Sequence, residues 1–98
     1  MNRNILDKNI YQLVDIIKQI DSKNELNCFF KELLTQSEIN TLSKRLRILK
    51  QLLLGHTQRQ IAQDLKVSLC KVTRGSKIIQ DKNSVLKKYL IKELQNEN

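Results

Sequence analysis

The sequence predicts an all-α protein, and three observations lead to this class. The 98-residue chain has no proline and two glycines, so it lacks the residues that usually punctuate β hairpins. Its apolar residues recur at steps of three and four, the spacing of one helix face. Residues typical of helix caps stand between the apolar runs. We expect one domain over residues 1–98, with a core so small that association with a second chain would stabilise it.

Two helices are expected before residue 35. The first runs from about Asp7 to Ile20, and the segment "DSKNE" ends it. Its apolar face comprises Leu6, Ile10, Leu13, Val14, Ile17 and Ile20. The second helix is short, and its apolar residues are Leu26, Phe29, Phe30, Leu33 and Leu34. The spacing in both segments is that of an amphipathic helix.

A long third helix is expected to begin after Thr35. Thr35 and Glu38 have the form of a capping box, in which each side chain bonds to the backbone N–H of the other residue. One apolar stripe follows, formed by Ile39, Leu42, Leu46, Leu49 and Leu53 and widened by Ile48 and Leu52. Gly55 comes directly after this run and is a good residue to end a helix.

Two short helices between residues 57 and 80 have the pattern of a helix-turn-helix motif. Thr57 is a candidate N-cap for the first helix and Ser68 for the second. The residues expected to face inward are Ile61, Ala62, Leu65, Val67 and Val72. Such a cluster lets two short helices meet at roughly 90–120°. The turn is expected to hold Lys66 in a left-handed conformation, at a cost of about 1 kcal/mol.

The sixth and last helix is expected to begin at Asn83 or Ser84, after a break at residues 81–83. Its apolar residues are Leu86, Tyr89, Leu90 and Leu94. The tail "QNEN" is polar, and no repeat or second domain is visible in the chain.

The positive charge of the chain is concentrated in one segment. The formal net charge is +8, and residues 43–77 contain nine Lys or Arg against one acid, Asp64. This segment therefore carries the whole excess. A basic segment inside a neutral frame indicates a polyanionic partner, and double-stranded DNA is the partner that a helix-turn-helix motif suggests. The alternative is a helical dimerisation module whose basic face contacts another acidic molecule.

The second short helix, from Ser68 to about Gln80, is the predicted recognition helix, and its N-terminal residues should approach base edges. Leu69, Cys70 and Thr73 lie on its outward face by spacing; the first two suit a thymine methyl group and the third a hydrogen bond. The residues expected to contact phosphates are Gln58, Arg59, Lys71 and Lys77.

The sequence argues against an enzyme, a metal site or a membrane protein. Cys28 and Cys70 fit no zinc spacing, and His56 has no acid or second histidine near it, so neither catalytic residues nor metal ligands are expected. No apolar run approaches the roughly 20 residues that span a membrane. With no signal peptide, we expect a reducing, cytoplasmic location.

The residues around the motif resemble the bacterial tryptophan repressor family. The resemblance extends over about Leu33 to Ile79. It is carried by "LSKRLRILKQLLLG", by "QRQIA" after it, and by "VTRGS" followed by a basic residue. It implies an intertwined homodimer of six-helix chains, in which helices one, two, three and six interlock and helices four and five form the DNA-reading head. Two such heads would read a near-palindromic operator whose half-sites lie one helical turn apart.

The resemblance also implies L-tryptophan as a co-repressor, and no other cofactor. The indole would lie between Arg45 and Arg74, and Arg74 would pair with the ligand carboxylate. Gly75 would leave room for the indole, and Ile78 stands where the family commonly has a serine that contacts the ligand amine. The contacts expected from the partner chain are Thr35 and the backbone around Leu33 and Leu34.

The function implied is a transcriptional repressor of genes for tryptophan biosynthesis or uptake. The alternative is a constitutive DNA-binding regulator of the same fold, with no ligand or with a different small molecule.

Overall fold

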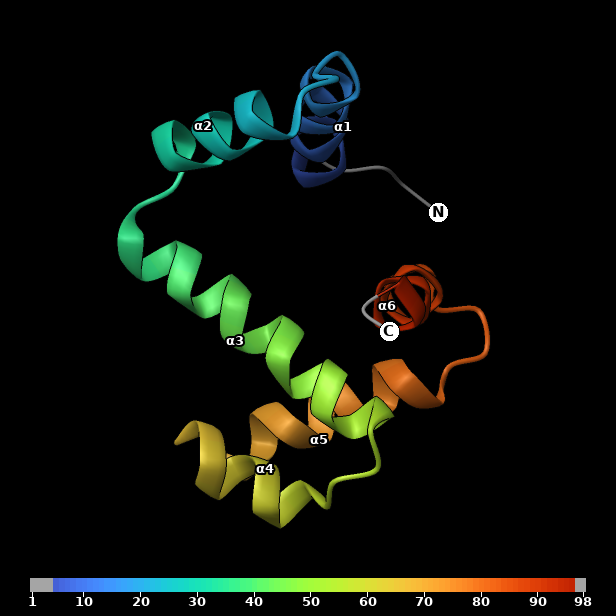
Figure 1. The fold of residues 1–98 in the computed structure, drawn as a ribbon. Helices are drawn as coiled ribbons and strands as arrows, with labels where there is room; N and C mark the ends of the chain where they lie inside the picture. Colours follow the sequence, from blue (N-terminus) through green and yellow to red (C-terminus); the bar gives the residue numbers. More distant parts are fainter. Residues whose placement is uncertain (1–4, 97–98) are drawn as a thin grey trace. The chain divides into compact units, whose positions relative to one another are not determined.

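The computed structural model describes residues 5–96, and within them the chain forms six α-helices (Figure 1). The helices are α1 (Ile5–Lys18), α2 (Lys23–Leu33), α3 (Gln36–Leu53), α4 (Gln58–Leu65), α5 (Leu69–Gln80) and α6 (Val85–Asn96). The described residues contain no strand, so the all-α class and the order of six helices are confirmed. The chain divides into two compact units, one up to Ile39 and one from Asn40 onward.

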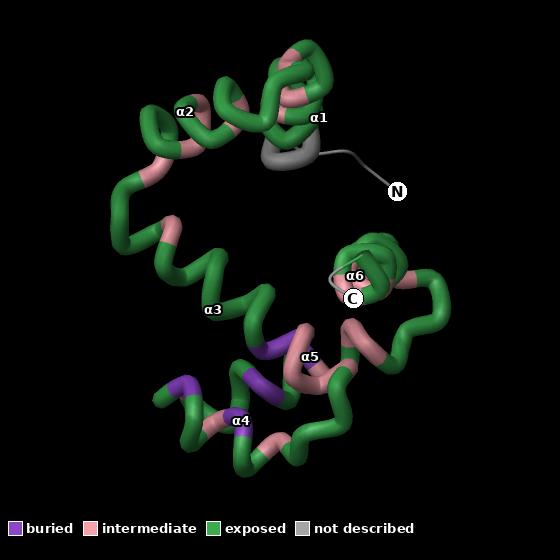
Figure 2. Tube along the Cα trace, in the orientation of Figure 1, coloured by how far each residue is buried: buried purple, intermediate pink, exposed green. Residues whose placement is uncertain are grey.

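The N-terminal unit has apolar helix faces that remain largely open to solvent. Among the described residues of α1, Ile10, Val14 and Ile16 are between 41% and 49% exposed. Helix α2 contains no buried residue, although its two phenylalanine rings pack edge to face with their centroids 5.5 Å apart. Figure 2 shows no buried position in α2 or in residues 8–18 of α1. This unit therefore presents apolar surface and buries little of it.

Helix α3 begins with the capping box that the sequence predicted. The Thr35 backbone N–H donates to Glu38 Oε1 at 2.9 Å, and the Glu38 N–H donates to Thr35 Oγ1 at 3.1 Å. Hydrogen bonds from the backbone and the side chain of Thr35 hold the pKa of the Glu38 carboxyl below its ordinary value. The carboxylate thus stays ionised beside the N-terminus of α3, where negative charge is favourable.

The C-terminal unit holds the small core of the chain. Ile48, Ile61, Leu65 and Val72 form a buried cluster, with Leu52, Ala62 and Val67 packed against it. The cluster joins the end of α3 to α4 and α5, where Figure 2 places the buried positions. All five residues predicted to face inward in the two short helices and their turn belong to this cluster or pack against it. The stripe predicted on α3 is buried at its C-terminal end only, because Leu42 and Leu46 are 43% and 46% exposed.

Two left-handed residues end α3 and α4, as predicted. Gly55 has a φ of 93°, and the bonds Gly55 N to Leu52 O and His56 N to Gln51 O, both 3.1 Å, satisfy the last carbonyls of α3. Lys66 has a φ of 55° and a ψ of 48°. Its N–H and that of Val67 donate to Gln63 O and Ala62 O. Lys66 is the only non-glycine residue with a positive φ in the described part of the chain.

Replacing Lys66 by glycine should stabilise the protein. The Lys66→Gly variant removes the steric cost of a β-carbon at a left-handed residue, so we expect the free energy of unfolding to rise by about 1 kcal/mol in urea titrations. Gln63→Gly is the matched control, since it places glycine within the right-handed last turn of α4 and should lower the free energy of unfolding by about 1 kcal/mol. A loss of stability in Lys66→Gly would contradict this account.

Candidate nucleic-acid interface

The two short helices α4 and α5 form a compact head because each is capped and both share one apolar cluster. Thr57 Oγ1 accepts a bond from the Gln60 N–H at 3.1 Å, and Ser68 Oγ accepts one from the Lys71 N–H at 3.3 Å. Both predicted N-caps are therefore confirmed. Ile61 on α4 and Val72 on α5 are completely buried. With a three-residue turn between them, the helices have the form of a helix-turn-helix.

Gly75 lets α5 lie directly on α3. A β-carbon at this position would stand 3.0 Å from Ile48 Cγ2, 3.3 Å from Leu49 Cδ2 and 3.4 Å from Leu52 Cδ1. The first two distances are shorter than ordinary van der Waals contact. The family resemblance implies that this glycine leaves room for a ligand. In the structure the absent side chain also permits close packing of two helices, and a larger residue would require the side chains of Ile48 and Leu49 to shift or α5 to move away from α3.

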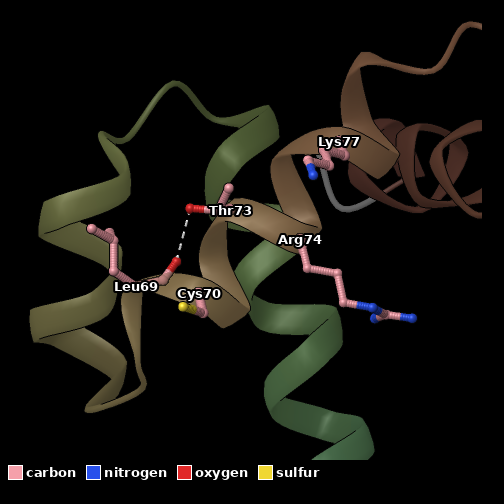
Figure 3. A pocket seen from close by; sticks show the side chains of 5 residues that line it. All are labelled: Leu69, Cys70, Thr73, Arg74 and Lys77. Atoms are coloured by element: carbon pink, nitrogen blue, oxygen red, sulfur yellow. Dashed lines mark hydrogen bonds between the residues drawn. The ribbon is translucent and has the colours of Figure 1, made fainter.

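The exposed face of α5 carries an open groove of about 310 Å³ (Figure 3). It is lined by Leu69, Cys70, Thr73, Arg74 and Lys77. The first three are the residues predicted to face bases, so the structure gathers them on one surface. Leu69 is 52% exposed although it belongs to a helix with a buried face. An exposed apolar side chain beside polar and cationic ones matches the needs of major-groove contact.

The hydroxyl group of Thr73 connects the two helices of the head. Thr73 Oγ1 lies 3.0 Å from Gln58 Oε1 on α4 and 3.0 Å from the carbonyl oxygen of Leu69, one turn earlier on α5. Figure 3 shows the second of these bonds. Sequence reasoning assigned Gln58 and Thr73 to separate tasks. No local pattern connects residues fifteen positions apart, so only the fold reveals this pair.

The positive charges of the head stand at its surface. Arg59 on α4 and Lys71 and Lys77 on α5 are exposed, as is Ser68 at the start of α5, while Gln58 is half-buried. The whole basic segment, residues 43–77, lies in the C-terminal unit. Exposed cations on both helices can approach a phosphate backbone without any cost of burying charge. That they contact phosphates stays a prediction.

The residues predicted to bind an amino acid fall into two groups. Arg45 lies on α3 one turn before Ile48 and Leu49, and Arg74 directly precedes Gly75, so both guanidinium groups extend from adjoining parts of two packed helices. Both arginines are exposed, and Arg74 points away from Leu69 and Thr73 (Figure 3). Ile78 is half-buried.

The second group belongs to the N-terminal unit. Leu33 is exposed, and the N–H of Leu34 donates to Phe30 O at 2.9 Å, which completes the end of α2. Thr35 is already engaged in the capping box of α3. These three residues were predicted to reach the ligand from a partner chain, and that role stays a prediction.

Residues 5–96 meet the requirements of neither a metal site nor a membrane-spanning helix. In that range no group of three or more His, Cys, Asp or Glu side chains is arranged to hold a metal ion, and Cys28 and Cys70 are free and exposed. None of the described helices combines the length and the apolar character needed to cross a membrane.

A capped pair of short helices over one apolar cluster, with a cationic and partly apolar exposed face, defines a helix-turn-helix DNA-binding protein. The family model described as Trp repressor protein matches residues 8–94. The chain therefore belongs to the Trp repressor family of DNA-binding transcription regulators, and it is not an enzyme.

Proteins of several bacteria are similar to this chain. A Trp operon repressor homolog of Xylella fastidiosa is 36% identical over 83 residues, which cover 84% of this chain and 88% of the relative. The homolog of Vibrio campbellii is 33% identical over 84 residues, covering 85% of this chain and 84% of the relative. That of Photobacterium profundum is 32% identical over 80 residues, or 81% and 78% of the two chains. The comparison with solved structures gave no match.

Two substitutions on α5 should separate binding from stability. Leu69→Ala shortens an exposed side chain, so we expect the free energy of unfolding to change by no more than about 0.5 kcal/mol while affinity for a preferred DNA duplex falls. Val72→Ala removes methyl groups from the fully buried cluster and should lower the free energy of unfolding by about 2 kcal/mol. Equal DNA affinity in Leu69→Ala and the unmodified protein would remove this residue from the interface.

Proposed function

We propose that this protein is a transcriptional repressor that binds operator DNA as a homodimer and is activated by L-tryptophan. It would control genes for tryptophan biosynthesis or uptake. The observation that carries the proposal is the head of α4 and α5, which has a basic surface with exposed apolar side chains. The membership of the chain in the Trp repressor family supports the same proposal. Similar chains in Xylella fastidiosa and Vibrio campbellii bear the name Trp operon repressor homolog.

The distribution of apolar surface supports a homodimer. Among the described residues, all five buried hydrophobic side chains lie in the C-terminal unit. They are Ile48, Leu49, Ile61, Leu65 and Val72. Exposed large apolar residues occur on α1, α2, α3 and α6, the helices that the resemblance to the tryptophan repressor family assigns to dimerisation. They include Ile10, Val14, Leu42, Leu46, Leu86 and Tyr89. Apolar faces of this extent are typical of surfaces that a partner covers.

The two arginines support an aromatic amino acid as the ligand. Arg45 and Arg74 extend from α3 and α5 near the point where Gly75 brings these helices together. A planar guanidinium group stacks favourably on an aromatic face, and it also pairs with a carboxylate through two parallel hydrogen bonds. A ligand held between them would alter the angle of α5, and with it the position of the reading face.

Two observations favour the alternative of a constitutive regulator. Ile78 is half-buried and has no hydroxyl group to accept a bond from a ligand amine, and the β-carbon direction of Gly75 is filled by Ile48, Leu49 and Leu52. In the gated protein the ligand amine must therefore bond to backbone carbonyl groups. In the alternative, α3 alone holds α5 at the angle that DNA requires.

The decisive experiment is a titration with L-tryptophan. A preferred duplex is first selected from a random library, and its affinity is then measured with and without millimolar L-tryptophan, together with the ligand's heat of binding. We expect the ligand to raise DNA affinity at least tenfold, equivalent to about 1.4 kcal/mol of coupling. A protein that selects one sequence but shows neither heat nor altered affinity supports the constitutive alternative.

Arg74→Ala should abolish the response to L-tryptophan, because it removes one stacking plane and the carboxylate partner together. Arg47→Ala is the matched control: it removes a cation from the same basic segment, on α3, and should leave the ratio of affinities with and without ligand unchanged. An undiminished ligand response in Arg74→Ala would refute the assigned pocket. The mass of the protein in solution tests the homodimer, and a monomer at micromolar concentration would exclude it.

A further inference from the structure

The hydroxyl proton of Thr73 is already used inside the head. The oxygen lies 3.0 Å from Gln58 Oε1 and 3.0 Å from the carbonyl oxygen of Leu69, and both partners are acceptors. A hydroxyl group has one proton to donate and two lone pairs that accept. Thr73 therefore shares its single proton between two protein acceptors. Toward the groove it offers lone pairs and its methyl group, but no donor.

The same contact determines what Gln58 offers. A glutamine that reads adenine uses its amide oxygen and its amide N–H together, in a bidentate pair. The oxygen of Gln58 accepts from Thr73 on one of its two lone pairs, which fixes the orientation of the amide and leaves its N–H groups as donors. The pair thus presents a donor from α4 and an acceptor from α5.

The position of the acceptor is well defined. Thr73 is branched at its β-carbon, so its χ1 angle has few alternatives. The bond to the Leu69 carbonyl group, four residues earlier, holds the hydroxyl group from one side, and Gln58 holds it from the other. Thr73 is exposed and lines the groove with Leu69 and Cys70 (Figure 3). An acceptor held in this way can discriminate between base edges.

We propose that Gln58 and Thr73 form one specificity-determining pair that selects adenine or cytosine on the contacted strand at a single position of each half-site. Adenine N6 and cytosine N4 carry the exocyclic amines that donate in the major groove, whereas guanine and thymine present O6 and O4 acceptors at the same place. When the hydroxyl oxygen of Thr73 faces guanine O6 or thymine O4, two acceptors meet with no proton between them. This loss of a hydrogen bond disfavours guanine and thymine at that position. The inference rests on the proposed DNA-binding function and deepens it.

The test is a position-by-position measurement of base preference, made with and without millimolar L-tryptophan. Each variant is first selected against a random duplex library, and its affinity is then measured on duplexes that carry each of the four bases at every position of the site. We expect the unmodified protein and Thr73→Ser to prefer A or C over G or T by about 5- to 100-fold at one position per half-site. Thr73→Val keeps the shape of the side chain but has no oxygen, so its preference at that position alone should disappear.

The role of Gln58 is tested by a double-mutant cycle. Gln58→Met removes the amide but keeps the length of the side chain, so the Leu69 carbonyl group alone then holds the Thr73 hydroxyl group, and base preference at the same position should weaken. The double variant Gln58→Met with Thr73→Val should lose no more base preference at that position than Thr73→Val alone, because the two residues act as a unit. Lys71→Ala is the control: loss of an exposed cation beside the pair should weaken all duplexes alike.

The possible results separate the failure of this inference from that of the proposed function. If the unmodified protein selects a sequence while Thr73→Val keeps every base preference, only the pair is wrong. A preference for G or T at the position that Thr73 controls would also overturn it, since the hydroxyl group would then be the donor. If the unmodified protein selects no sequence at all, the proposed DNA-reading function fails, and the pair with it. Thermal melting of each variant verifies that the head is folded.

Discussion

The contact of Val72 with Ile61 and Ile48 is the interaction on which the rest of the structure depends. These side chains come from α5, α4 and α3, and each is at most 3% exposed. They hold the two short helices to each other and to the end of the long one. Short helices have little stability of their own in water, so this cluster positions every residue of the reading face. The cluster is small, so we expect that a ligand or DNA can shift the position of the head.

Charge and apolar surface are segregated along the chain. The excess of cations lies within the C-terminal unit, beside the groove of α5. The uncovered apolar faces extend over α1, the first part of α3 and α6. The first distribution suits a polyanion and the second suits another apolar face. This division is consistent with a protein in which one set of helices joins two chains and another set contacts DNA.

Much of the fold could be predicted from local signals. The capping box at Thr35, the caps at Thr57 and Ser68 and the left-handed Lys66 and Gly55 all follow from short patterns whose energetics are local. The inward residues of α4 and α5 follow from helical spacing. The stripe on α3 was predicted as one continuous face, yet Leu42 and Leu46 are exposed in a single chain, because periodicity does not say what covers a face.

By itself the sequence determined the six helices, their ends and the basic character of the head, because each depends on residues within a few positions of one another. The tertiary structure decided which polar groups meet. The bond between Thr73 and Gln58 joins two helices, and the contacts of Gly75 join α5 to α3. Neither is visible in the order of residues, because each depends on the angle at which two helices cross. That angle is set by the packing of the whole cluster and not by any one segment.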